Sequence, residues 1–130
     1  MKQTLTKAER LSSKKVIERL FEKGSASTRT FYLFPFRVIY LSDEEHPAEL
    51  PAILITVSRR NFKKAVDRNL IRRRTREAYR KNKPLLFGST EQPKSPPAYI
   101  AFLYTAREKI SFEEIEKSVK LALSKVGSKR

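Results

Sequence analysis

The stretch VSRRNFKKAVDRNLIRRRTREAYR, residues 57–80, decides how the rest of the sequence is interpreted. It begins at the end of an apolar run, and the chain then has no Gly or Pro from about Phe62 to Lys81. The residue types in this interval favour helix, because Gly and Pro, the two residues that interrupt helices, are missing. We therefore predict a strand that ends near Val57 and a long helix after it.

The positive charge of the chain is concentrated in the same stretch. The whole sequence has 29 Lys and Arg against 14 Asp and Glu, which gives a net charge of +15. Residues 59–83 hold twelve of the cations and only two acids, Asp67 and Glu77, and thus contribute +10. Such an excess implies a polyanionic partner, either a nucleic acid or an anionic lipid surface.

On a helical wheel the predicted helix has a cationic side and an apolar side. The cationic arc spans roughly 140° and contains Arg68, Asn69, Arg72, Arg73, Arg76 and Arg80. The opposite arc carries Val66, Leu70, Ile71 and Ala78. Arg74 falls among these apolar positions and is expected to extend outward to solvent, while Tyr79 borders the arginine arc.

Charged residues on a helix usually face solvent without a binding partner, but this explanation does not suit the cationic arc. Like charges four residues apart destabilise a helix by about 0.2–0.5 kcal/mol per pair, and almost no carboxylate compensates them here. Binding to a lipid surface needs an exposed apolar face, which the core requires for itself. Arginine grips phosphate at two points, and we therefore interpret the arc as a nucleic-acid surface.

The basic surface is expected to continue beyond the N-terminal end of the helix. Arg59, Arg60, Lys63 and Lys64 precede it, and main-chain amides at a helix N-terminus attract phosphate. Asn69 suits a 2′-hydroxyl, a base edge or a metal-bound water, and equally an ordinary surface amide.

Two further helices and about three further strands complete the predicted fold. LSSKKVIERLFEKG (residues 11–24) has a helical apolar spacing and a Gly stop, and the run from Ser111 to Val126 opens with a Ser111–Glu114 capping box. Its predicted apolar face consists of Ile115, Val119, Ala122, Leu123 and Val126.

FYLFPFRVIYL, residues 31–41, is expected to form one bent strand or two short ones around Pro35. LPAILITV (residues 50–57) is expected to pair with it as an antiparallel hairpin, and AYIAFLY (residues 98–104) is another short strand. The order α-β-β-β-α-β-α predicts an α/β sandwich of the α+β kind, with three helices and a small mixed sheet of about four strands. Residues 1–130 are expected to form a single domain.

Composition excludes several classes of protein. There is no Cys, so a disulfide frame and a thiolate metal site are ruled out. No apolar run approaches the roughly 18 residues that span a bilayer, and the N-terminus lacks the apolar stretch of a signal peptide. We expect a cytoplasmic protein that does not enter a membrane and has no obligate protein partner.

A protein-borne nuclease site is not expected either. The one His, His46, lies in an acidic loop, and consecutive carboxylates such as Asp43, Glu44 and Glu45 ordinarily solvate a turn. No catalytic and no metal-ligating residue is assigned.

The segment from Val57 to Arg80 resembles the signature of the bacterial ribonuclease P protein. Its features are a Val-Ser strand end, a basic pair, Ala-Val, Arg-Asn, and spaced basic residues that end in Arg-Glu-Ala-aromatic. Two departures stand out: Leu70 occupies a position that is usually basic in the family, and the NFKK segment is one residue longer than usual. The element order extends the resemblance loosely over nearly the whole chain.

The resemblance implies the protein subunit of a ribonucleoprotein enzyme. Arg68, Asn69, Arg72, Arg73 and Arg76 would dock on the catalytic RNA, whose Mg²⁺ ions carry out the chemistry, and the protein would promote removal of the 5′ leader from precursor tRNA. The family fold also implies a left-handed strand–helix–strand crossover.

A cleft between the first helix and the sheet would bind the single-stranded leader. The positions in this sequence that match the cleft are Ile17, Phe21, Tyr32, Phe34 and Phe36. Aromatic faces suit unpaired bases, although Ile17 replaces the aromatic residue usual in the family, and aromatics at these spacings also suit a core. The alternatives are a ribosomal or general RNA-binding protein of similar fold, and a stand-alone nuclease.

Overall fold

The computed structural model describes residues 28–41, 51–88, 94–95, 97, 99–126 and 128–129. The strands of these segments are β1 (Thr28–Leu33), β2 (Phe36–Leu41), β3 (Ala52–Val57), β4 (Lys94–Ser95), β5 (Tyr99–Tyr104) and β6 (Ser128–Lys129). The helices are α2 (Ala65–Asn82), the short 3-10 helix η2 (Lys83–Phe87) and α3 (Phe112–Lys125). The helix predicted over residues 11–24 lies outside the described residues.

Four strands form one mixed sheet in the order β1-β2-β5-β3. The two short strands around Pro35 pair as an antiparallel hairpin, β2 pairs antiparallel with β5, and β5 pairs parallel with β3. The predicted hairpin between β2 and β3 is therefore wrong, because β5 lies between them and pairs with both. The mixed four-stranded sheet itself is confirmed.

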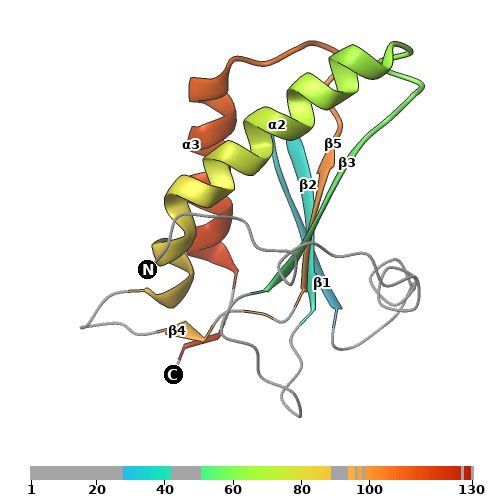
Figure 1. Ribbon diagram of the computed structural model, residues 1–130. Helices are drawn as coiled ribbons and strands as arrows, with labels where there is room; N and C mark the ends of the chain where they lie inside the picture. The colour runs from blue at the N-terminus through green and yellow to red at the C-terminus, as the bar shows by residue number, and fades with distance from the viewer. Residues whose placement is uncertain are drawn as a thin grey trace.

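The chain passes from β3 to its parallel neighbour β5 through α2, and α2 and α3 cover the same face of the sheet (Figure 1). This is the strand–helix–strand unit that parallel pairing demands. The left-handed sense expected of this crossover remains a prediction. None of the helices in the described segments is long and apolar enough to cross a membrane.

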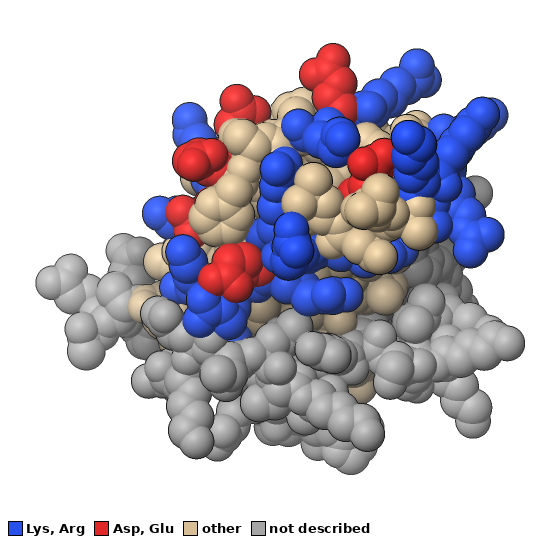
Figure 2. Space-filling model, turned by 45° about the horizontal axis from the view of Figure 1, so that its top comes forward, with Lys and Arg blue, Asp and Glu red and all other residues tan. Residues whose placement is uncertain are grey.

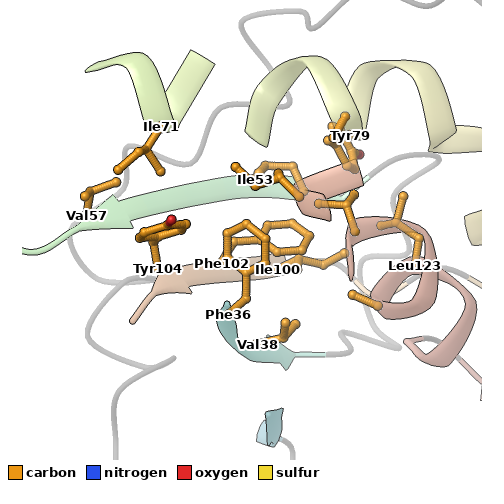
Figure 3. Close-up of a cluster of buried hydrophobic side chains, with 14 of the residues drawn as sticks. Phe36, Val38, Ile53, Val57, Ile71, Tyr79, Ile100, Phe102, Tyr104 and Leu123 are labelled. Carbon is orange, nitrogen blue, oxygen red and sulfur yellow. The ribbon is translucent and has the colours of Figure 1, made fainter. Parts of the chain in front are cut away.

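The core lies between the sheet and the two helices (Figure 3). Phe36 of β2 lies edge-on to Phe102 and Tyr104 of β5, with ring centroids 5.7 Å apart in both pairs. From the helices, Ile71 and Tyr79 of α2 point toward these strands. The alternation of side chains along each strand thus places one set of large apolar residues under the helices.

The other face of the sheet is also apolar at its centre. Ile39, Leu41 and Ala101 are buried there, and Leu54 and Leu103 are partly buried against them. The central strands β2 and β5 are consequently buried on both faces.

The sequence signals for α3 are confirmed. The Ser111 hydroxyl accepts a hydrogen bond from the Glu114 amide at 3.3 Å, which is the N-cap that the capping box predicts. The five residues predicted for the apolar face, Ile115, Val119, Ala122, Leu123 and Val126, are all buried. The packing of α3 against α2 fixes the position of α2 on the sheet.

Candidate nucleic-acid interface

The rotation of α2 on the sheet decides which side chains reach solvent. Ile71 and Ala78 are buried as predicted, but the other buried positions are Thr75 and Tyr79. Tyr79 is fully buried instead of bordering the arginine arc, whereas Val66, predicted on the apolar side, is 70% exposed. The large Tyr79 ring removes more apolar area from water than Val66, which favours this rotation.

The six residues of the cationic arc consequently divide into two groups. Asn69, Arg73 and Arg76 are exposed, whereas Arg68, Arg72 and Arg80 are half-buried. Within the described part of the chain, Arg73 has no hydrogen bond or ion pair. It is therefore available to a partner without the loss of a polar contact to another described residue.

Arg68 is bonded to the main chain just ahead of the helix. Its Nη1 donates to the Phe62 carbonyl at 2.8 Å and to the Lys63 carbonyl at 2.9 Å. These bonds tie the helix to the turn that precedes it.

Arg72 and Arg80 each contact a side chain on α2 itself. Arg72 Nη1 donates to Asn69 Oδ1 at 3.1 Å. Arg80 forms an ion pair with Glu77, with its Nε 3.1 Å from Oε2. The hydrogen bond from Arg80 lowers the pKa of Glu77, and the same bond raises the pKa of Arg80.

Arg74 differs from the expectation that it extends outward. Its Nη1 donates to the Ile110 carbonyl at 2.8 Å, in the segment before α3. Arg74 is thus a structural residue that joins α2 to this segment, and it does not belong to the exposed cationic surface.

The turn before α2 presents the four other predicted cations. Arg59, Arg60, Lys63 and Lys64 are all exposed. Phe62, in their midst, is buried in the core, and its amide donates to the Ser58 carbonyl at 3.0 Å. The buried Phe62 side chain therefore fixes the position of this turn, while the four charged side chains face water.

We use the term basic surface for the four cations of this turn together with the six residues of the cationic arc on α2. Figure 2 shows one face of the molecule, where Lys and Arg side chains surround uncharged ones and single carboxylates lie among them. One of the acids of α2, Asp67, accepts from Lys109 at 3.2 Å, and the other, Glu77, pairs with Arg80. The exposed residues of the basic surface are Arg59, Arg60, Lys63, Lys64, Asn69, Arg73 and Arg76, and its half-buried residues are Arg68, Arg72 and Arg80.

The residues expected to bind the leader do not lie together. Tyr32 is 59% exposed on the sheet face opposite the helices, and Phe34 is 56% exposed in the β1–β2 turn. Phe36 is fully buried on the helix side, so we correct its assignment to the cleft. Ile17 and Phe21 lie outside the described residues.

The turn at Phe34 and Pro35 causes this separation. In one continuous strand, residues 32, 34 and 36 would share a face. The register instead pairs Leu33 with Phe36 and Tyr32 with Arg37, and cross-strand partners share a face. The exposed Arg37 therefore lies beside Tyr32, a neighbour that the sequence interpretation missed.

Among the described residues, no group of three or more His, Cys, Asp or Glu side chains could hold a metal ion. The predicted acidic loop with His46 lies outside these residues. The groups that dominate the described surface are cations, which suit the binding of an anion.

The fold and this surface define a small, strongly basic α+β protein with a cationic helix on its outer face. The Ribonuclease P family model matches residues 5–127, and the chain belongs to this family. Ribonuclease P protein components of two Porphyromonas gingivalis strains are 35% and 34% identical over 123 residues, which cover 95% of this chain and 86% of each relative. A solved structure of the Staphylococcus aureus RNase P protein has the same fold, with a TM-score of 0.69 at 21% identity over 94% of this chain and 100% of that chain.

Proposed function

We propose that this chain is the protein subunit of ribonuclease P and that its basic surface, called the RNA surface from here on, holds the catalytic RNA. The observation that carries the proposal is the outer side of α2, where the exposed Arg73 and Arg76 flank Asn69 in a chain of this family. Arginine binds phosphate through a planar fork with two donors, which a Lys cannot supply. The whole chain then acts as one RNA-binding domain.

The turn before α2 adds phosphate contacts at the end of the helix. Arg59, Arg60, Lys63 and Lys64 face water there, and Lys64, the N-cap residue, makes no side-chain cap to the first amides of α2. Uncapped amides at a helix N-terminus attract phosphate. These contacts fix the register of the protein on its RNA without reading sequence.

The 5′ leader of precursor tRNA binds on the sheet face that carries Tyr32. The Tyr32 ring offers a stacking surface to an unpaired base, and Arg37 beside it offers a charge to the phosphate. Ile17 and Phe21, on the helix expected over residues 11–24, complete the cleft, while Phe36 has no part in it. Binding of the leader favours precursor over mature tRNA.

The hydrolysis itself belongs to the RNA. Mg²⁺ held by RNA phosphates would supply the activated water. The protein binds, orients and neutralises charge, and no residue of this chain is assigned a catalytic role.

The direct test adds the purified protein to the ribonuclease P RNA of the same organism at low Mg²⁺ and measures leader removal from precursor tRNA. We expect faster cleavage and tighter binding of precursor than of mature tRNA. The protein alone should cleave nothing. Unchanged cleavage and affinity, or co-purification with ribosomal RNA instead, would contradict the proposal.

A further inference from the structure

The outer side of α2 is hollowed in its N-terminal half. The hollow is lined by Val66, Asp67, Asn69, Leu70, Arg73 and Arg76. Val66 is 70% exposed, and its neighbour one turn on, Leu70, is half-buried. Side chains at this spacing lie next to each other on a helix. Two aliphatic side chains in the middle of a cationic surface thus remain open to water.

The rim of the hollow is positively charged. Arg73 and Arg76 are exposed, and Arg73 has no internal partner among the described residues. The one acid, Asp67, is paired with Lys109 at 3.2 Å, which offsets its charge. The hollow therefore combines an apolar floor of Val66 and Leu70 with the guanidinium groups of Arg73 and Arg76.

We propose that this hollow takes an unpaired nucleotide of the bound RNA. The base lies on Val66 and Leu70, and the adjoining phosphates reach Arg73 and Arg76. The inference rests on the proposed function, since it names the kind of contact that α2 makes with its RNA.

A cationic surface attracts several kinds of ligand, but an unpaired nucleotide fits the chemistry of this hollow best. A phosphate alone would leave the aliphatic floor in water, and a paired duplex keeps its base faces stacked inside the helix. A second copy of this chain would bring its own excess of cations to the rim and be repelled. An unpaired nucleotide supplies both an apolar face and a negative charge.

The first test compares a Val66→Ser/Leu70→Ser variant with the wild type in binding to the ribonuclease P RNA over a series of KCl concentrations. We expect affinity to fall about tenfold, because one base contact of this kind is lost. The slope of log affinity against log salt should stay unchanged, since no phosphate contact is removed. Leu121→Ser, at a 51% exposed position on α3, is the matched control and should bind as the wild type does.

Equal affinities of the double variant and the Leu121→Ser control would overturn the inference. Failure of the wild type itself to bind this RNA would instead contradict the proposed function.

A second measurement avoids any loss of folding: Val66, which is largely outside the core, is replaced by a photo-crosslinking phenylalanine derivative. We expect crosslinks at an unpaired nucleotide, whereas crosslinks only within duplex segments, or none, would contradict the inference.

Discussion

The guanidinium of Arg68 donates to the main-chain carbonyl of Phe62 at 2.8 Å, and Phe62 is itself buried in the core. Arg68 belongs to the cationic arc predicted from the sequence, and it also holds the turn that carries Arg59 and Arg60. The two roles have different consequences. A residue that only contacts phosphate contributes its own charge, whereas Arg68 also sets the position of its neighbours.

Replacing Arg68 by Met should therefore weaken RNA binding more than replacing Arg73 by Ala. We expect the affinity for ribonuclease P RNA to fall by more than tenfold, and stability to fall by about 1–2 kcal/mol through the lost hydrogen bonds. Hydrogen exchange of the free protein should show faster exchange at the amides of residues 58–64. Arg74→Met is the matched control, because Arg74 binds the Ile110 carbonyl away from the RNA surface. It should lower stability and leave affinity nearly unchanged; equal effects of the two variants on affinity would refute the positioning role.

The wheel predicted the cationic arc but not how the helix is turned on the sheet. Val66 and Tyr79 exchange their expected places because sequence spacing alone cannot compare the area that each side chain buries. The partners of Arg68 and Arg74 are main-chain carbonyls, which carry no signature in the residue types. Such contacts emerge only when tertiary packing brings the segments together.

Glu77→Gln should strengthen RNA binding at neutral pH. The Arg80 hydrogen bond lowers the pKa of Glu77 below its ordinary value of 4.5, so at neutral pH the carboxylate is ionised and holds that guanidinium. The Gln variant has no carboxylate to hold Arg80, and it has one negative charge fewer. We therefore expect the affinity for ribonuclease P RNA to rise several-fold. Both side chains remain in part open to solvent, so the ion pair contributes little to stability.

The control for this variant is Glu113→Gln, which removes the same charge from the first turn of α3. It should change affinity much less. An equal rise in RNA affinity in both variants would mean that net charge alone, and not the Glu77–Arg80 pair, limits RNA binding. Binding titrations at one fixed salt concentration suffice for this comparison.

We predict that the folded protein loses stability at alkaline pH through ionisation of the Tyr104 hydroxyl. Burial raises the pKa of its hydroxyl above the ordinary value of 10.0, although the Ile110 amide, which donates to it at 3.0 Å, acts in the opposite direction. The unfolded chain then releases this proton first, so the contribution of the neutral phenol is complete below pH 10 and is lost as pH rises through the folded pKa.

Tyr104→Phe should cost about 1–2 kcal/mol at neutral pH, because the Ile110 amide loses its acceptor. The difference in stability between wild type and variant should shrink as pH rises above 10.0. Denaturant titrations from neutral to alkaline pH measure this difference. A constant difference over the whole range would contradict the raised pKa.

The residues expected to bind the leader show what periodicity along the sequence cannot predict. Periodicity in a strand assigns Tyr32 and Phe36 to one face, but the two-residue turn between β1 and β2 reverses the alternation. The capping box at Ser111 and Glu114 is a local signal, and its N-cap bond from the Glu114 amide to the Ser111 hydroxyl is confirmed. Local patterns thus predicted the start and the apolar face of α3, whereas the faces of β1 and β2 depend on the turn between them.

The most direct test of the RNA surface is the salt dependence of binding by an Arg73→Ala/Arg76→Ala variant. Binding of ribonuclease P RNA is measured over a range of KCl concentrations, with Lys117→Ala/Lys120→Ala on α3 as the equal-charge control. We predict that the slope of log affinity against log salt becomes shallower by about two in the α2 variant, one for each lost phosphate contact, and stays nearly unchanged in the control. The same slope for the α2 variant as for the wild type would contradict the assignment of α2 as the RNA-docking element.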